Sequence, residues 1–395
     1  MTLLPEDSAT ATLLGRVFDP ESDGPCLVQL RGERLVDVTA AGPTLSALLA
    51  LDDPASAAGA IPDHRGWDVR AVMARSLDRR GTPSEPVLLA PCDLQVVKAC
   101  GVTFAGSMIE RVIEERAKGD PAEAASLRAR IGGAIGGAIG GALNRLRPGS
   151  PEALAAKTAL IREGLWSQYL EVGIGTDAEI FTKAPVLSSV GAGDEIGVLS
   201  TSAWNNPEPE VVLAVDGQGR IKGASLGNDV NLRDYEGRSA LLLGKAKDNN
   251  ASCAIGPFLR LLDDRFTLDD LRGLTLDLTV TGASDGFVLR GHSSMREISR
   301  DPEDLVRQAI GAHHRYPDGF MLFLGTLFAP VQDRDQPGSG FTHRQGDLVE
   351  IASQRLGRLV NRVGHAETAP PWQFGIGALM RNLAARGLLH DERRF

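Results

Sequence analysis

The spacing of apolar residues divides the chain into a short mixed segment, a helical segment and a long segment of strands. Near the N-terminus, brief apolar stretches alternate with turn-forming Gly, Pro and Asp residues, and two further stretches have helical spacing. The predicted strands are 10–18, 26–30 and 34–38, and the predicted helices are 44–51 and 69–76. We therefore predict a small N-terminal domain over residues 1–92 and a larger domain over residues 93–395.

Residues 107–165 follow a helical pattern that forms an insertion in the larger domain. Met108 and Val112 lie one helical turn apart, with charged residues between them. Within this insertion, residues 131–143 repeat a four-residue unit that contains two glycines. Each glycine costs about 0.8–1 kcal/mol relative to alanine inside a helix. Close packing against another helix or subunit must offset that cost, so we predict a tightly packed helix here.

After about residue 170 the pattern changes to short apolar runs broken by Gly, Asp and Asn. The predicted strands are 210–215, 221–226, 274–281, 287–289, 320–324 and 348–353, and the predicted helices are 239–244, 303–312 and 374–386. Asp301 followed by Pro302 is typical of a helix start. Many short strands separated by turns indicate an α+β fold with a β-rich core, arranged as a sandwich or a rolled barrel.

Composition and charge exclude several classes of protein. Apolar residues make up 43% of the 395 residues and charged residues 24%, which are globular values rather than those of a disordered chain. The net charge of −9 argues against a general nucleic-acid binder. Apolar runs are far shorter than the ~20 residues that span a bilayer, and the N-terminus lacks a signal-peptide pattern. The four cysteines form no CxxC pair. We predict a cytoplasmic protein with reduced thiols, and neither a nucleic acid nor a membrane as partner.

Three acidic residues are predicted to meet at one end of a hairpin. Glu208 and Glu210 are two residues apart where a strand begins, so both side chains point to one face. A turn at Asp216 returns the chain along 221–226, which brings Asp229 back towards the pair. Buried carboxylates repel each other unless a cation neutralises them, and their hard oxygen atoms suit Mg²⁺, with Mn²⁺ not separable by ligand type. The spacing alone also fits exposed carboxylates at strand ends.

Two basic residues near this triad have candidate roles. Lys247 can act as a base if burial lowers its pKa, or it can bind a substrate carboxylate. Arg233 lies four residues after Asp229, and we predict that it orients that carboxylate. A structural ion pair with another residue is the alternative for Arg233.

The residues around the triad carry a family resemblance. The segments GNDVNLRDYEGR, from Gly227, and KAKDNNASCAIGP, from Lys245, follow the Glu-x-Glu pair. This combination resembles the signature of the fumarylacetoacetate hydrolase superfamily, and the resemblance covers roughly residues 96–363. It implies a mixed β-roll catalytic domain and a divalent metal, usually Mg²⁺. It assigns Glu208, Glu210 and Asp229 as metal ligands, Lys247 as the active-site lysine, and Gly325-Thr326 as a substrate contact.

A lid segment distinguishes the branches of this family. Its C–C hydrolases carry Tyr-Ala-x-His-x-x-Glu, whereas this chain has Ser107 at the His position and keeps Glu110. The segments LWSQYLEVGIGTDAEIFTKAPVLSSVG and HHRYPDGFMLFLGT resemble the family's 2-keto-3-deoxy-pentonate dehydratases instead. That resemblance implies Mg²⁺-dependent conversion of 2-keto-3-deoxy-D-xylonate, the same compound as the D-arabinonate derivative, to 2,5-dioxopentanoate. The alternatives are an acylpyruvate-type C–C hydrolase, a 2-oxo acid decarboxylase, or a catalytically silent protein that binds sugar acids.

The implied reaction assigns a role to each candidate residue. Lys247 is predicted to remove the C3 proton of a 2-oxo acid whose enolate the metal stabilises. Glu110 is predicted to protonate the departing C4 hydroxyl, with Glu114 as the second candidate; a solvated helix face is the alternative for both. The predicted substrate contacts are Ser107, Arg111, Lys183, Asn250, Ser252 and Thr326. The resemblance also implies a small sugar acid as ligand and a homodimer or homotetramer as assembly.

Overall fold

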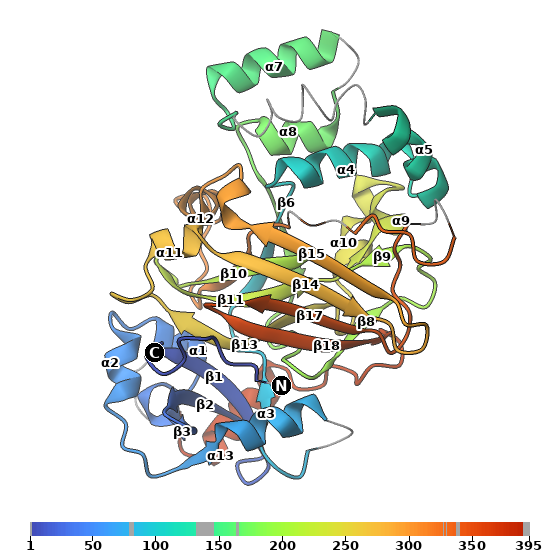
Figure 1. Cartoon of the computed structure of the whole chain (residues 1–395). Coiled ribbons are helices and arrows are strands. Elements are labelled where there is room, and N and C mark those ends of the chain that lie inside the picture. The colour runs from blue at the N-terminus through green and yellow to red at the C-terminus, as the bar shows by residue number, and fades with distance from the viewer. Residues whose placement is uncertain are drawn as a thin grey trace.

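Two sheets form the centre of the molecule, and helices gather at its two ends (Figure 1). The computed structural model describes residues 2–78, 83–131, 146–162, 166–326, 328, 330–336 and 340–389. Within these ranges one sheet has eleven strands and the other has five. The predicted α+β fold with a β-rich core is confirmed.

The larger sheet joins the N-terminal part of the chain to the predicted catalytic part. Its strand order is β4 (Gly66–Asp68), β3 (Arg34–Asp37), β2 (Gly24–Arg31), β1 (Leu13–Asp19), β13 (Cys253–Leu261), β11 (Ile221–Asp229), β10 (Pro209–Val215), β16 (Phe320–Phe323), β6 (Val96–Gly101) and β7 (Glu179–Ala184). Strand β5 (Val87–Leu89) also pairs with β1. All neighbours are antiparallel except β16 and β6. Because β1 pairs with β13, one continuous sheet crosses the predicted boundary at residue 92.

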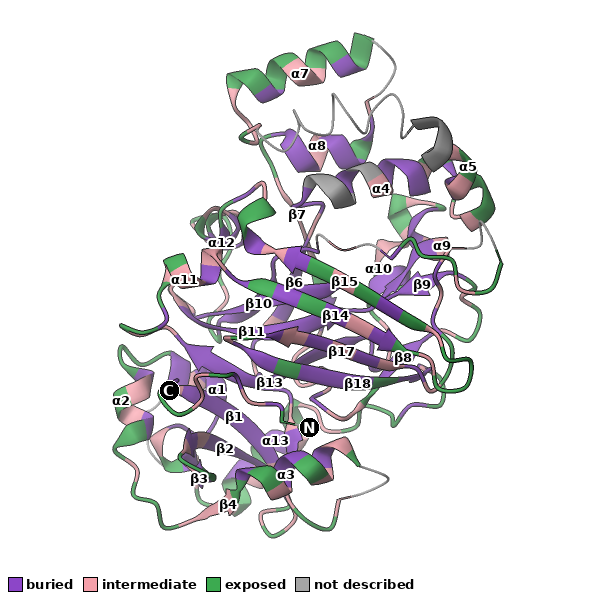
Figure 2. Cartoon of the chain, viewed as in Figure 1, coloured by how far each residue is buried: buried purple, intermediate pink, exposed green. Residues whose placement is uncertain are grey.

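The smaller sheet covers one face of the larger one. Its order is β15 (Val288–Ser294), β14 (Thr275–Thr281), β17 (Leu348–Ser353), β18 (Gly357–His365) and β8 (Glu195–Val198). Buried and exposed residues alternate along β14, as expected for a sheet with one solvated face (Figure 2). A separate short ladder pairs β9 (Asn205–Asn206) with β12 (Asn231–Leu232).

The helices form separate groups around these sheets. The N-terminal group is η1 (Thr39–Ala41), α1 (Leu45–Leu49), α2 (Pro54–Gly59) and α3 (Val69–Leu77). The insertion supplies α4 (Ala105–Arg116), α5 (Pro121–Ile131), α7 (Pro151–Arg162) and α8 (Gln168–Ile174), which lie together at the opposite end (Figure 1). The others are α9 (Arg233–Glu236), η2 (Ala240–Leu242), α10 (Leu243–Lys247), α11 (Leu268–Arg272), η3 (Met295–Glu297), α12 (Pro302–Ala309) and α13 (Ile376–Ala385).

The predicted helical insertion is confirmed where the structure describes it, in α4, α5 and α7. Most of the glycine-rich repeat, from residue 132 onward, lies outside the described residues, so its predicted close packing stays a prediction. The helix predicted at 239–244 differs in detail, because the chain there forms η2 first and then α10, which ends at Lys247. Among the described helices, none combines the length and the apolar character needed to cross a membrane.

Strand β10 is buried on both faces, which explains its uninterrupted apolar sequence. Val211 and Leu213 belong to an apolar cluster that includes Leu278 of β14. Val212 belongs to a second cluster that includes Leu48 of α1. Each buried side chain of this size contributes roughly 1.5–3 kcal/mol to folding. The hairpin of β10 and β11 is therefore fixed in position by packing on both sides.

The C-terminal helix returns to the N-terminal part of the chain. In α13, Asn382 donates hydrogen bonds to the carbonyl oxygens of Ser22 and Asp23, at 2.8 and 2.9 Å. Arg386, directly after the helix, donates to the Pro25 carbonyl oxygen at 2.8 Å. The end of the predicted second domain thus packs against the first, and the division at residue 92 stays a prediction.

Gly193 holds the loop before β8 against α3. Its φ is +91°, and an added Cβ would lie 1.9 Å from the carbonyl oxygen of Ser76. We expect Gly193→Ala to lower the free energy of unfolding, measured by urea denaturation, by about 1–3 kcal/mol, because it adds both strain and overlap. The control is Gly59→Ala in α2, where an added Cβ meets open space. That variant should shift stability by at most about 1 kcal/mol, towards greater stability. Equal effects of the two substitutions would contradict this account.

Candidate active site and metal centre

The hairpin of β10 and β11 brings three carboxylates together. Glu208 directly precedes β10, Glu210 is its second residue, and Asp229 ends β11. Glu210 lies opposite Gly227, and the Asp229 N–H donates to the Glu208 carbonyl oxygen at 3.0 Å. Residues that face each other across antiparallel strands share a face of the sheet. All three residues are buried, and one carboxylate oxygen from each lies within 4.8 Å of the others. This is the meeting point that the hairpin pattern predicted.

Glu210 carries the least compensated charge of the three. Its Oε2 accepts a hydrogen bond of 2.6 Å from the Gly325 N–H. Burial raises the pKa of Glu210 well above its usual value, and the neighbouring Asp229 and Glu208 carboxylates raise it further. Gly325 has a φ of +90°, and an added Cβ would lie 2.0 Å from the Thr103 hydroxyl oxygen, so only glycine fits there.

Lys247 places its ammonium group between two of the carboxylates. The distances from Nζ are 2.6 Å to Glu208 Oε2 and 2.8 Å to Asp229 Oδ2. Burial by itself would lower the pKa of Lys247, but the Asp229 and Glu208 carboxylates raise it above its ordinary value. Burial alone therefore does not lower this pKa, because the two carboxylates outweigh desolvation, and the role of Lys247 as a base stays a prediction. For Glu208, burial acts to raise the pKa, but Lys247 and Arg111 hold it below its usual range.

Lys183 supports the site through contacts with Asp229 and with the backbone. Its side chain is fully buried, and Nζ lies 2.8 Å from Asp229 Oδ1. The same ammonium donates to the carbonyl oxygens of Val230, at 3.1 Å, and Lys247. Three partners occupy the three donors of a lysine. Lys183 thus fixes Asp229 and the end of α10, and its predicted contact with substrate stays a prediction.

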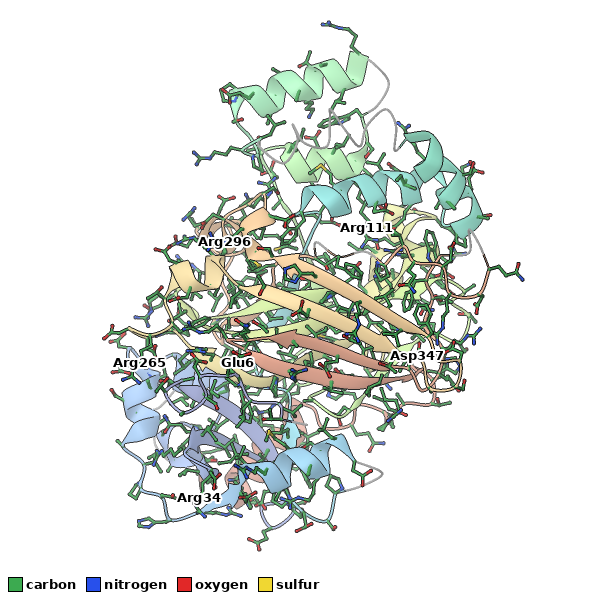
Figure 3. All side chains as sticks on the ribbon, in the orientation of Figure 1. Glu6, Arg34, Arg111, Arg265, Arg296 and Asp347 are labelled. Atoms are coloured by element: carbon green, nitrogen blue, oxygen red, sulfur yellow. The ribbon has the colours of Figure 1, made fainter. Side chains whose placement is uncertain are left out.

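Arg111 lies on helix α4 (Figure 3) and connects this helix to the triad. Its guanidinium contacts Glu208 Oε1, and Nη1 lies 2.6 Å from Glu114 Oε2 and 2.8 Å from Glu236 Oε2. The predicted substrate contact of Arg111 stays a prediction, because three protein carboxylates already surround the group. Glu114 is buried and also lies, through Oε1, 3.2 Å from Arg233 Nε. Each carboxylate oxygen of Glu114 thus forms an ion pair with an arginine.

Arg233 orients a different carboxylate from the one predicted. It pairs with Glu114, donates to the Pro330 carbonyl oxygen at 3.0 Å, and lies over the Trp204 ring at 5.3 Å. Asp229 takes its partners from Lys183 and Lys247 instead. The prediction that Arg233 orients Asp229 is wrong, because α9 directs its side chain towards the helical insertion.

Two predicted substrate contacts have structural roles. Asn250 donates to the carbonyl oxygens of Ala366, Ala369 and Pro370, at 3.1 to 3.3 Å, and so anchors the loop before α13. Ser252 is buried and donates to the carbonyl oxygen of Lys247 at 2.8 Å, which closes the turn after α10. Both side chains thus have backbone partners, and their assignment as substrate contacts stays a prediction.

The remaining predicted residues keep their assignments as predictions. Thr326 is buried beside Gly325, and its hydroxyl exchanges hydrogen bonds of 3.2 Å with the backbone of Phe328. Glu110 is partly buried on α4 and is already engaged in an interaction. The side chain of Ser107 lies outside the described part of the chain.

Sequence reasoning missed two carboxylates near the site. Glu236 is buried on α9 beside Arg111, and its pKa is raised by burial. Glu179 begins β7, and burial raises its pKa to about 7, with the nearby Glu236 carboxylate adding to the effect. One signal for Glu179 was available, because residues 179 and 181 are two apart on a strand and therefore share a face.

The donor set fits a divalent cation. Three carboxylates on adjoining strands supply hard oxygen ligands, as Mg²⁺ and similar ions require. The raised pKa of Glu210 means that the protein's own cations do not balance all three negative charges. Glu208, Glu210 and Asp229 would hold the ion, and it would supply the missing positive charge.

Comparison with known proteins points to one family. Residues 195–364, which contain the whole triad and Lys247, match the family model described as fumarylacetoacetate (FAA) hydrolase C-terminal. This stretch of the chain is similar to that family domain. A solved structure named "2-keto-3-deoxy-D-arabinonate dehydratase complexed with magnesium and 2,5-dioxopentanoate" has the same fold. Its TM-score is 0.60 at 21% identity, and the alignment covers 89% of this chain and 99% of that one.

Two curated relatives resemble about half of this chain in sequence. The 2-dehydro-3-deoxy-D-arabinonate dehydratase of Saccharolobus solfataricus is 32% identical over 187 residues, which are 47% of this chain and 58% of that protein. The probable 2-keto-3-deoxyxylonate dehydratase of Haloferax volcanii is 32% identical over 196 residues, or 49% of this chain and 63% of that protein. The matches thus span about three fifths of each relative's length.

Glu208→Gln should weaken metal binding. The substitution removes one anionic ligand and one partner of Lys247. We therefore expect the affinity for Mn²⁺, measured by electron paramagnetic resonance, to fall by more than roughly 10-fold, because loss of a residue that only supports a ligand already costs about that much. Glu195→Gln on the exposed start of β8 is the control and should leave the affinity unchanged. Near-ultraviolet circular dichroism checks that each variant is folded. Unaltered Mn²⁺ affinity of folded Glu208→Gln would contradict the assignment of this residue as a ligand.

Proposed function

We propose that this protein is a Mg²⁺-dependent dehydratase that converts 2-keto-3-deoxy-D-pentonate (xylonate or arabinonate) to 2,5-dioxopentanoate. The observation that carries the proposal is the buried triad of Glu208, Glu210 and Asp229 with the Lys247 ammonium in contact with two of them. The names of the two curated relatives support the same reaction and substrate class. So does the solved structure with this fold, which is named as a complex with magnesium and 2,5-dioxopentanoate.

The triad and Lys247 together suit the first half of such a reaction. A divalent ion held by the three carboxylates would supply a Lewis acid for the oxygens of a 2-oxo acid and a positive charge that lowers the pKa of Lys247. Lys247, freed from part of its attraction to Glu208 and Asp229, would take the proton from C3. Lys183 and Gly325 hold Asp229 and Glu210 in place during this transfer. The charged contacts of Arg111 close the site on the side of α4.

We propose, in addition, that the enzyme acts in the cytoplasm as a homodimer or homotetramer and that Mn²⁺ can replace Mg²⁺. Reduced cysteines agree with this compartment, since all four cysteines are free and buried. Light scattering on the purified protein tests the assembly. Activity with each ion added back after chelation tests the choice of metal.

The function is tested by a coupled assay with purified protein, 2-keto-3-deoxy-D-xylonate and Mg²⁺. An added semialdehyde dehydrogenase reports 2,5-dioxopentanoate through NAD(P)H formation. We expect product to form, EDTA to abolish the signal, and excess Mg²⁺ to restore it. Pyruvate released from a 2,4-dioxo sugar acid, with no dehydration of the first substrate, would move the protein to the C–C hydrolases. Release of CO₂ would indicate a decarboxylase.

Lys247→Arg and Lys247→Met should both lose the proton transfer at C3. Arginine keeps the positive charge between Glu208 and Asp229 but cannot act as a base near neutral pH. We expect turnover to fall by roughly 10²–10⁴-fold in both variants. Exchange of the C3 protons of substrate with D₂O, followed by nuclear magnetic resonance, should fall in parallel.

The control is Lys245→Met on the exposed side of the same short helix, which should keep wild-type turnover and exchange. Undiminished C3 exchange in a folded Lys247→Arg protein would show that another group is the base.

A further inference from the structure

An open cavity lies between helix α11, the turn η3 and the start of α12. Its volume is about 390 Å³, which is within the range of small-molecule binding sites. Arg296 lines the cavity and lies beside α11 and α12, away from Arg111 (Figure 3). The cavity shares none of its lining residues with the triad or with the ion-pair partners of the triad. It is therefore separate from the candidate active site.

One wall of the cavity is apolar. Met295 and Pro302 are buried, Ile298 is half-buried, and all three line the cavity. Removal of apolar surface from water is the main favourable contribution to most association. This apolar wall, formed by the three residues, thus fits the hydrocarbon part of a ligand.

Two arginines also line the cavity, and they differ in their partners. Arg272 has ion pairs of 2.7 to 2.8 Å with three carboxylates, which belong to Asp269, Asp301 and Glu303. Arg296 is exposed, and its Nη2 lies 3.5 Å from the position of a Cβ added at Gly273. Within the described part of the chain, the Arg296 guanidinium has neither a hydrogen-bond partner nor an ion-pair partner. Arg296 is therefore the cation that can pair with a ligand.

The charges around the cavity favour a carboxylate as its ligand. A guanidinium binds a carboxylate or a phosphate through two parallel hydrogen bonds. Asp269 and Asp301 line the same cavity, and they would repel a doubly charged phosphate more strongly than a singly charged carboxylate. Together with the apolar wall, this charge pattern suits a small carboxylate that carries an apolar body.

Residues 298–300, at the edge of the cavity, also hold the helical insertion. Ile298 forms an antiparallel bridge with Phe104, the residue directly before α4. Ser299 donates to the Thr103 carbonyl oxygen from its N–H, at 2.7 Å, and from its hydroxyl, at 2.8 Å. The buried Arg300 donates to four carbonyl oxygens, at 2.8 to 3.4 Å, in the last turn of α8 and the loop after it. These belong to Val172, Gly175, Thr176 and Asp177.

Thr103 connects this segment to the metal centre. Its hydroxyl donates to the carbonyl oxygen of the residue before Gly325, at 2.6 Å, and fills the space that a side chain at Gly325 would need. The Gly325 N–H in turn donates to Glu210 Oε2. Helix α4, which starts beside Thr103, carries the Arg111 guanidinium that contacts Glu208. The cavity is thus connected to two of the three triad carboxylates.

We propose that this cavity is a regulatory site that binds a small carboxylate with an apolar body, and that its occupation strengthens metal binding at the triad. A ligand against Ile298 restrains residues 298–300 and, through Thr103, restrains Gly325 and the start of α4. A metal ion that binds to a restrained triad loses less conformational entropy, so the two ligands bind with positive cooperativity. By linkage, the metal strengthens carboxylate binding by the same factor. Neither binding event depends on which reaction the site catalyses.

The probe for this site is 4-phenylbutanoate, which joins one carboxylate to an apolar chain and ring. Saturation-transfer nuclear magnetic resonance on the full chain with Mg²⁺ should detect its binding, and the uncharged 4-phenylbutanamide should bind more weakly. We expect Arg296→Ala to lower the affinity for 4-phenylbutanoate by roughly 10-fold or more, as for loss of hydrogen bonds to a charged group. The control is Arg307→Ala on the exposed side of α12, which removes the same charge and should leave this affinity unchanged.

Gly273→Leu tests the cavity while both arginines are kept. An added Cβ at Gly273 would lie 3.4 to 3.6 Å from its nearest neighbours, which is ordinary contact, so the backbone need not move. The leucine side chain would occupy the cavity, and we expect detectable binding of 4-phenylbutanoate to disappear. Near-ultraviolet circular dichroism checks that each variant is folded.

Occupation of the cavity should be measurable at the metal centre. We expect saturating 4-phenylbutanoate to raise the affinity for Mn²⁺, measured by electron paramagnetic resonance, by at least roughly 5-fold, the lower end of the usual coupling between linked sites. Hydrogen exchange, followed by mass spectrometry, should become slower in α4 and α8 but not in α2. Arg296→Ala should lose both effects of the probe, and Arg307→Ala should retain them.

Several outcomes would overturn the proposal. Absence of 4-phenylbutanoate binding to the wild-type protein, up to the solubility limit of the probe, would remove the site. Equal binding to the wild type and to folded Arg296→Ala or Gly273→Leu would place the probe elsewhere. Displacement of the probe by inorganic phosphate at the same concentration would contradict the choice of a carboxylate. Binding in the cavity without a change in Mn²⁺ affinity would show that the two sites are not coupled.

Discussion

The site depends on a balance of buried charge. The triad carboxylates lie together in a largely apolar sheet, where an uncompensated charge is far more costly than in water. Lys183 and Lys247 form ion pairs with Asp229, and Arg111 and Lys247 form ion pairs with Glu208. Among the described residues, no cation pairs directly with Glu210, and its pKa is raised. Strand β7 and helices α4 and α10 carry the cations Lys183, Arg111 and Lys247 to this one hairpin.

Local patterns predicted that the three carboxylates lie close together, and the family resemblance then favoured metal ligands over exposed carboxylates at strand ends. The two-residue spacing of Glu208 and Glu210 and the turn at Asp216 determine which side chains share a face, and such short-range geometry can be read from sequence. The uninterrupted apolar run of β10 likewise predicted, from local sequence alone, that this strand is buried. The contact between Lys247 and the triad was predicted by family resemblance, although the direction of its pKa shift depends on two carboxylates at close range and was not.

Partners that meet only through the tertiary fold could not be predicted. Lys183 and Ser252 carry polar side chains typical of substrate contacts, but backbone carbonyl groups occupy them once β7 and α10 are in place. Arg233 meets Glu114 because the fold brings α9 next to the helical insertion. The four-residue spacing between Asp229 and Arg233 is equally compatible with a contact between those two residues. Glu179 belongs to no motif, and its environment arises from the pairing of β7 with a glycine on β6.

The ladder between β1 and β13 makes the N-terminal part of the chain a cover for the catalytic sheet. Every residue of β13 is buried; one side pairs with β11, and Leu259 and Arg260 pair with β1 on the other side. A protein without residues 1–92 would leave this end of β13 as an open edge with unpaired N–H and C=O groups, the kind of strand that recruits other chains into aggregates. The N-terminal part thus covers an edge of the same strand whose opposite end pairs with Asp229.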